Sequence, residues 1–139
     1  MLKKLIVNAD DFGIDEAVNR AVLRGFESGI LTSTSLMAGG DAFQEAVKLA
    51  RDMKGIGIGI HLTLVGGLKP VLPPEEVPSL TWENGRLCSN YMELILRDMK
   101  GRISRDDVYR ESEAEIRKIQ DTGLTVTPID GHPHMHIWN

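Results

Sequence analysis

The stretch Ile56-Gly57-Ile58-Gly59-Ile60-His61-Leu62 decides the fold of this chain. Its strict alternation predicts a β-strand with three isoleucines on one face and two glycines and a histidine on the other. A strand that presents bare backbone on the side where His61 points indicates that another group approaches closely there. We therefore expect this strand to be buried on its isoleucine face and to contribute to a site on the other.

The segments on either side of this strand alternate between strand-like and helix-like periods. Residues 5–7 form an apolar run that predicts a short buried strand. Residues 30–37 are rich in β-branched side chains and predict a second strand, and residues 124–130 are predicted to be extended. Four helices are predicted between these strands, over residues 16–28, 42–54, 92–99 and 105–122. This order predicts an α/β fold with a parallel sheet and right-handed crossovers, either doubly wound or part of a barrel. The last of these helices is expected to turn one face inward, consisting of Val108, Ser112, Ile116 and Ile119.

Composition excludes several classes of protein. The 139 residues carry 16 Lys and Arg against 20 Asp and Glu, and this acidic balance without a basic cluster argues against a nucleic-acid partner. No apolar run reaches the roughly 18 residues of a membrane span, and the start of the chain turns acidic too early for a signal peptide. The single cysteine, Cys88, suits a reducing compartment. We expect a cytoplasmic protein that acts on a small molecule and has no membrane partner.

Three polar clusters follow predicted strands, and they contain all four histidines of the chain. They are Asp10-Asp11, His61, and the run Asp130-Gly131-His132-Pro133-His134-Met135-His136. In parallel α/β folds this edge of the sheet is where ligands bind. Taken singly, the clusters also fit a solvated strand end, a core histidine and a histidine-rich surface loop. Taken together, one Asp with two His matches the ligands of a divalent metal site, and a second carboxylate beside it can act as a general base.

Four motifs together resemble the YdjC-like carbohydrate deacetylases. They are Val7-Asn8-Ala9-Asp10-Asp11-Phe12-Gly13, Thr32-Ser33-Thr34, Gly59-Ile60-His61-Leu62-Thr63-Leu64 and the run from Asp130 to His136. The resemblance implies a distorted TIM-like barrel of the polysaccharide-deacetylase type. It also implies a divalent metal and the removal of acetyl groups from N-acetylated sugars such as chitooligosaccharides.

The resemblance also implies residue roles. Asp11, His61 and His132 match the metal ligands of the family, and Asp10 matches its catalytic base. Asp130, His134 and His136 are expected to line the substrate. For the metal, two imidazoles and one carboxylate favour Zn²⁺ over Mg²⁺, which prefers oxygen-rich sites.

The length of the chain departs from the family, because a (β/α) barrel needs about 250 residues. The sequence supplies roughly the first half of such a barrel, without the later histidine motif that resembles a general acid. We therefore expect a single, incomplete domain over residues 1–139, either truncated or completed by a second copy in a homodimer. The proton for the leaving amine would then come from His134, His136 or solvent.

Residues 66–90 contain four prolines and predict a long loop, which we interpret as a lid over the substrate. Trp82 in this loop is expected either to stack on a sugar ring or to anchor the loop to the body of the protein. Two other functions stay open. One is another metal-dependent hydrolase such as a phosphoesterase, although basic residues near the motifs are scarce and only Lys69 and Arg86 lie in the loop. The other is a truncated, non-catalytic protein that binds metal or assembles with partners.

Overall fold

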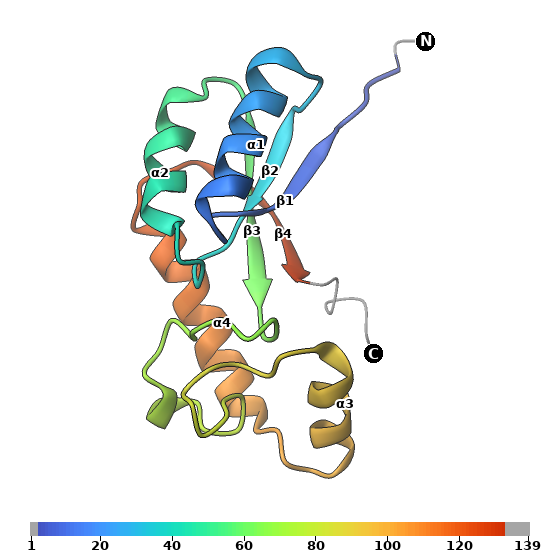
Figure 1. Ribbon diagram of the computed structural model, residues 1–139, viewed down its shortest axis with the longest axis vertical. Coiled ribbons are helices and arrows are strands. Elements are labelled where there is room, and N and C mark those ends of the chain that lie inside the picture. Colours follow the sequence, from blue (N-terminus) through green and yellow to red (C-terminus); the bar gives the residue numbers. More distant parts are fainter. Residues whose placement is uncertain (1–2, 133–139) are drawn as a thin grey trace.

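A four-stranded parallel sheet, in the order β1-β2-β3-β4, lies at the centre of the computed structural model, which describes residues 3–132 (Figure 1). The strands are β1 (Asn8–Phe12), β2 (Ser33–Leu36), β3 (Gly57–Thr63) and β4 (Val126–His132). All three neighbouring pairs are parallel. The structure therefore confirms the predicted α/β fold of parallel βα units.

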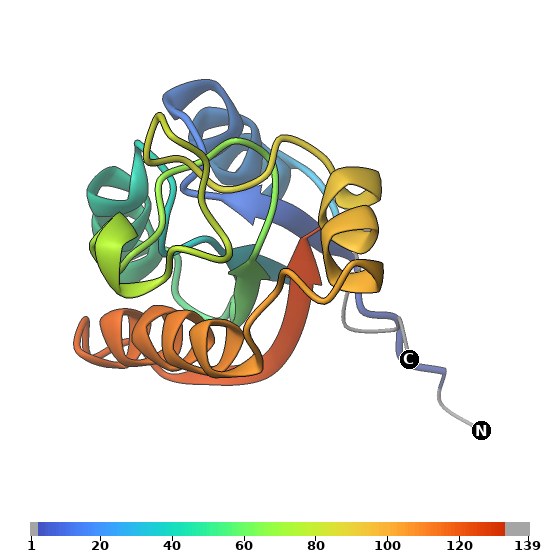
Figure 2. The same cartoon turned by 90° about the horizontal axis from the view of Figure 1, so that it is seen from below.

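The helices are α1 (Glu16–Ser28), α2 (Phe43–Asp52), α3 (Tyr91–Met99) and α4 (Arg105–Gln120), with a short 3₁₀ helix η1 (Pro74–Glu76). Side chains of α1, α2 and α4 share one apolar core with one face of the sheet, where Ile58 and Ile60 of β3 are buried. Figure 2 shows these three helices around the outside of the curved sheet. The strand predicted over residues 56–62 is confirmed, and so is the burial of its isoleucine face.

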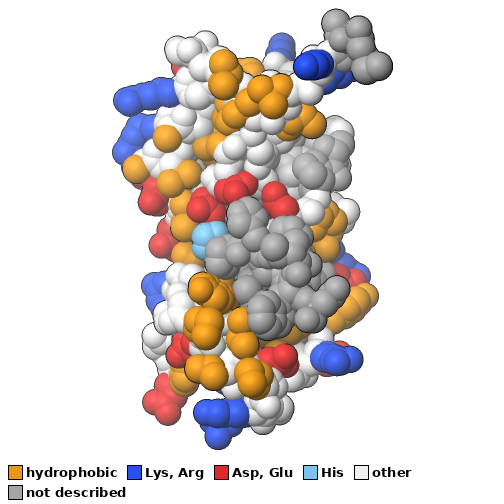
Figure 3. Space-filling model, turned by 90° about the vertical axis from the view of Figure 1, so that its right-hand side faces the viewer, with side chains coloured by type: hydrophobic (Ala, Val, Ile, Leu, Met, Phe, Trp, Pro, Cys, Tyr) orange, Lys and Arg blue, Asp and Glu red, His pale blue; other side chains and the backbone are white. Residues whose placement is uncertain are grey.

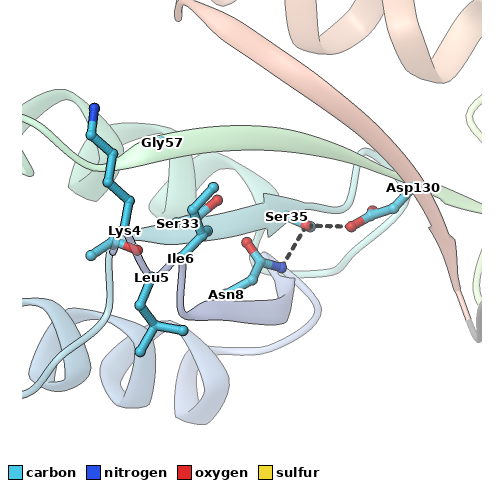
Figure 4. Close-up of a pocket in the computed structure, with 9 residues that line it drawn as sticks. Lys4, Leu5, Ile6, Asn8, Ser33, Ser35, Gly57 and Asp130 are labelled. Atoms are coloured by element: carbon cyan, nitrogen blue, oxygen red, sulfur yellow. Dashed lines mark hydrogen bonds between the residues drawn. The ribbon is translucent and has the colours of Figure 1, made fainter. Parts of the chain in front are cut away.

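The opposite face of the sheet bears an open pocket of about 900 Å³, which is lined by small and polar residues of the strands and by the apolar side chains of Leu5 and Ile6. Figure 4 shows its lining, which comes from the start of the chain, from β1, β2 and β3, and from Asp130 of β4. Ser33, Ser35 and Gly57 lie on this face because side chains alternate along a strand. The face of the sheet that packs against the helices thus carries apolar side chains, and the face towards the pocket carries small and polar ones.

Strand β1 begins later in the chain than the position that the apolar run at residues 5–7 predicted. Leu5 and Ile6 are 76% and 77% exposed, and β1 covers Asn8–Phe12 instead, so the prediction of a buried strand at residues 5–7 is wrong. The reason lies in the register, because the first residue of β1 pairs with Ser33, the first residue of β2. Residues before Val7 have no strand beside them among the described residues. Asp10 and Asp11 consequently lie within the strand rather than after it.

Three acidic side chains of α4 are buried, and the sequence patterns did not predict them. Asp107, Glu111 and Glu115 repeat at the four-residue spacing of one helix face and are at most 5% exposed. Their carboxylates accept backbone N–H groups from the last residue of β3 and from the segment that follows it: Glu115 from Thr63, Glu111 from Val71 and Leu72, and Asp107 from Ser79. The helix therefore supplies the acceptors that this irregular segment lacks.

The segment at residues 66–90 has a small core of its own, formed around Val77, Leu80 and Leu87. It lies beyond the carboxyl ends of β3 and β4, towards the bottom of Figure 1. Trp82 is 43% exposed, and the Arg97 guanidinium lies over its ring at 4.7 Å from the centroid. This contact ties Trp82 to α3, while the role of the segment as a lid stays a prediction. Within residues 3–132, no helix is long and apolar enough to cross a membrane.

The buried Glu115 predicts how stability depends on pH. Burial raises the pKa of its carboxyl well above the usual value, and the Glu111 carboxylate raises it further, while the Thr63 N–H and Lys118 oppose the rise. Above about pH 4.5 the unfolded chain releases this proton and the folded chain retains it, so the free energy of unfolding falls as pH rises. One group contributes at most about 1.4 kcal/mol per pH unit. Glu115→Gln keeps an acceptor for Thr63 and should remove this contribution.

Denaturant unfolding of the wild type and Glu115→Gln between pH 4 and pH 8 measures the difference. Glu113→Gln is the matched control, because Glu113 lies on the same helix with a partly exposed carboxylate that pairs with Arg117. Parallel curves for the wild type and Glu115→Gln would contradict the prediction.

Candidate metal centre

Three side chains from three strands meet at the carboxyl edge of the sheet. Asp11 comes from β1, His61 from β3 and His132 from β4, and each offers a ligand atom within 4.8 Å of the other two. Asp11 Oδ1 lies 3.2 Å from His61 Nε2 and 2.7 Å from His132 Nδ1. Figure 3 shows acidic side chains and a histidine gathered midway along this side of the molecule. The residues that the family resemblance assigned to a metal are thus together in space.

The backbone at Asp11 is strained in order to place this carboxylate. Asp11 has φ of 63° and is the one described residue other than glycine with a positive φ. The register of β1 against β2 shifts between Ala9 and Phe12, so a bulge lies at this point. A left-handed conformation costs a side-chain-bearing residue roughly 1 kcal/mol or more. Such strain is typical of functional sites, where the surrounding structure holds a residue in an unfavourable conformation.

A divalent cation fits this group of atoms. Asp11 Oδ1 is buried and makes no hydrogen bond to any described residue, although two imidazole nitrogens lie close to it. Atoms that bind zinc tetrahedrally at ~2.0–2.2 Å lie roughly 3.3 Å from one another. The 3.2 Å between Asp11 and His61 matches this spacing, and a small adjustment of His132 completes it. A cation between them would also satisfy the buried carboxylate oxygen.

Asp130 fixes the orientation of the His61 ring. Its Oδ1 lies 2.5 Å from His61 Nδ1, and the ring itself is 1% exposed. When Nδ1 carries the proton and donates it to Asp130, Nε2 presents its lone pair to Asp11 and to a cation. Asp10, His61 and Asp130 form a second cluster of potential ligands. The contact between Nδ1 and Asp130 leaves no room for an ion between those two atoms, so a cation bound by His61 would lie on the Nε2 side.

The two adjacent carboxylates have different neighbours. Asp11 faces the two imidazoles, whereas Asp10 Oδ1 accepts a hydrogen bond from Asn8 Nδ2 at 2.7 Å. The same Asn8 nitrogen donates to Ser35 Oγ at 3.0 Å. Asn8 and Ser35 were not among the predicted site residues. A pattern that points to them is their position on the polar face of β1 and β2, near the carboxylates.

The remaining predicted site residues are placed as follows. Asp130 lies in the group through its contacts with His61 and with Ser35, and its role in lining the substrate stays a prediction. His134 and His136 lie outside the described residues.

The fold and the side-chain cluster define an α/β protein with a candidate divalent-metal centre at the carboxyl edge of a parallel sheet. The family model described as "YdjC-like protein" matches residues 4–139. The chain belongs to the YdjC family.

Two curated relatives are named carbohydrate deacetylase. The protein from Geobacillus stearothermophilus is 39% identical over 136 residues, which is 98% of this chain and 51% of the relative. The protein from Brevibacillus brevis is 38% identical over 133 residues, or 96% of this chain and 50% of the relative. The chain therefore spans about half the length of the curated relatives that it matches.

A solved structure matches the fold closely. The crystal structure from Enterococcus faecalis V583, provisionally described as a cellobiose-phosphate cleavage protein, superposes with a TM-score of 0.86 and 35% sequence identity. The match covers 99% of this chain and 51% of the solved one. The arrangement of βα units is therefore that of one half of a known structure.

Because Asp11 is strained, we expect that replacing it with glycine increases the stability of the metal-free fold and weakens metal binding. Asp11→Gly removes the left-handed strain and should raise the free energy of unfolding in the presence of a chelator by roughly 1 kcal/mol. Asp11→Ala keeps the strain and should lower it. Both variants remove the carboxylate, so added Zn²⁺ should stabilise the wild type alone.

Thermal unfolding with chelator and with Zn²⁺, together with calorimetric titration of the metal, measures both effects. Asp11→Asn separates charge from conformation, because Asn tolerates a positive φ and lacks the anionic ligand. If Asp11→Gly binds Zn²⁺ as tightly as the wild type, Asp11 is not a ligand.

Proposed function

We propose that this chain carries the metal site and the catalytic base of a carbohydrate N-deacetylase, a hydrolase that removes acetyl groups from N-acetylated sugars. The observation that carries the proposal is the meeting of Asp11, His61 and His132, with a separate carboxylate, Asp10, beside them on the same strand. The names of the curated relatives support the same reaction class.

In this proposal Asp11, His61 and His132 hold the cation, and two nitrogens with one oxygen favour Zn²⁺ over Mg²⁺. A bound divalent cation supplies Lewis-acid chemistry, since it makes water more acidic and polarises a carbonyl oxygen. The carboxylate of Asp130 keeps the His61 ring turned so that Nε2 faces the cation.

Asp10 accepts the proton of the attacking water. The hydrogen bond from Asn8 Nδ2 to Asp10 Oδ1 holds the carboxylate in place, as the positioning of a general base requires. The amine that leaves the sugar needs a proton in turn. His134 and His136 follow the ligand His132 in the family motif, and we assign this proton and the contacts to the substrate to that part of the chain.

The segment at residues 66–90 is proposed to cover the sugar. It lies at the same edge of the sheet as the metal centre, and its Gly66 approaches the His132 ring, since a Cβ on Gly66 would lie 3.6 Å from His132 Nε2. The substrate we propose is a small N-acetylated saccharide.

The base role of Asp10 predicts a variant that binds metal without turnover. Asp10→Asn should lower acetate release from an N-acetylated glucosamine disaccharide by about 10²–10⁴-fold, because the amide cannot accept the proton. Zn²⁺ affinity should stay near that of the wild type, because Asp10 lies outside the proposed ligand set. Acetate release and calorimetric metal titration measure the two effects.

Asp41→Asn is the control, since Asp41 is an exposed carboxylate on the loop before α2. An active Asp10→Asn variant would remove Asp10 from the base role. Release of phosphate from a phosphorylated disaccharide, in place of acetate, would favour the phosphoesterase alternative. Metal binding by the wild type without either product would favour the non-catalytic one.

A further inference from the structure

One chain of hydrogen bonds crosses the sheet from the proposed base to the proposed metal ligand. Asn8 Nδ2 donates to Asp10 Oδ1 and to Ser35 Oγ, and Ser35 Oγ donates to Asp130 Oδ2 at 2.7 Å. Asp130 Oδ1 in turn meets His61 Nδ1. Figure 4 shows Ser35 between Asn8 and Asp130. The chain joins β1, β2, β4 and β3 in that order.

The chemistry of the donors fixes the direction of this chain. A carboxylate only accepts, so the single hydroxyl proton of Ser35 goes to Asp130, and the oxygen of Ser35 accepts from Asn8. The amide of Asn8 uses its two protons on Asp10 and Ser35. Asp130 then accepts the Nδ1 proton of His61, and in the neutral imidazole Nε2 carries no proton. Each proton thus has one partner, and the chain selects the tautomer of His61 that a cation requires.

Gly59 explains how Ser35 reaches Asp130. Neighbouring strands lie about 4.8 Å apart, so residues of β2 and β4 are separated by roughly twice that distance across β3. Ser35 pairs with Gly59 on β3, and Asp130 pairs with His61, two residues further on. Because Gly59 carries no side chain on this face, the hydroxyl and the carboxylate lean over the backbone of β3 and meet.

Ser35 is the central member of the chain and is buried. It is 1% exposed, as is His61, whereas the side chain of Asp130 is 26% exposed. A buried hydroxyl with both an acceptor and a donor partner holds its neighbours in one geometry. Ser33 lies one pleat earlier on the same face of β2 and belongs to no hydrogen bond of this chain.

We propose that Ser35 is a positioning residue for the metal centre and that Asn8 extends its effect to the base. Ser35 orients Asp130, which sets the tautomer and the angle of the His61 ring, and Asn8 links Ser35 to the Asp10 carboxylate by donating to both. The inference rests on the proposed function for the role of Asp10, whereas the effect on His61 stands on the hydrogen bonds alone.

Ser35→Ala tests the link, with Ser33→Ala as its matched control and Ser35→Thr as the conservative variant that retains the hydroxyl. In ¹⁵N-histidine NMR of the metal-free protein at alkaline pH, the wild type should show His61 protonated at Nδ1. Ser35→Ala should show a mixture of tautomers, and Ser33→Ala should not. The His61 signal is assigned by its loss in His61→Gln.

The same variants are titrated with Zn²⁺. Loss of a group that orients a ligand typically weakens metal binding by about 10–100-fold, so Ser35→Ala should fall in this range while Ser33→Ala and Ser35→Thr stay near the wild type. Circular dichroism confirms that each variant is folded. If Ser35→Ala matches Ser33→Ala in both the tautomer and the affinity, the positioning role is wrong.

Asn8→Ala tests the part of the hydrogen-bond chain that leads from Ser35 to Asp10. It should lower kcat for acetate release while KM and the Zn²⁺ affinity change little, because Asn8 contacts Asp10 and not the proposed ligands. An unchanged kcat would remove Asn8 from the proposal. If the wild type releases no acetate and Ser35→Ala still shifts the tautomer and the metal affinity, the proposed function fails and the role of Ser35 stands.

Discussion

The position of His61 between two carboxylates is the constraint on which the rest of the site depends. Asp130 faces Nδ1 and Asp11 faces Nε2, and the ring is almost fully buried between them. An imidazole has one proton to give in its neutral form, so only one of these contacts is a hydrogen bond. The shorter contact, to Asp130, takes the proton, which leaves Nε2 and the buried oxygen of Asp11 facing each other as two acceptors. A cation between them would remove that repulsion, which is the physical argument for a candidate metal centre at this place.

Stability and function make opposite demands on the residues around this ring. Asp11 holds a conformation that glycine would adopt without strain, and its buried oxygen lacks a hydrogen bond to the described residues. Both features weaken the metal-free fold. The buried carboxylates of α4 act in the other direction, since they tie down the segment that follows His61 in the chain by accepting its backbone N–H groups. The strained residue Asp11 thus contacts His61, and the segment that follows His61 is fixed by hydrogen bonds to α4.

Local patterns in the sequence predicted the elements whose causes are local. The alternation at residues 56–62 identified β3, and the helical pattern over residues 105–122 identified α4. The start of β1 depended on a partner strand 25 residues away, so the apolar run at residues 5–7 was misleading. Glu111 and Glu115 are spaced like a solvated helix face, and only the fold reveals that backbone N–H groups of the following segment and of the end of β3 meet them.

The same distinction between local causes and distant partners applies to the candidate site. The residue types in the motifs and their resemblance to a family indicated the side chains that meet at the candidate metal centre, because potential metal ligands are chemically distinctive. Ser35 and Asn8 are ordinary polar residues on strands, and their role depends on the register that aligns Ser35 with Gly59 and lets it reach Asp130. Register is a property of paired strands and not of one segment. A glycine in a half-buried strand can therefore indicate that two side chains from its neighbours meet over it, and at Gly59 those side chains connect the proposed base to the proposed metal ligand.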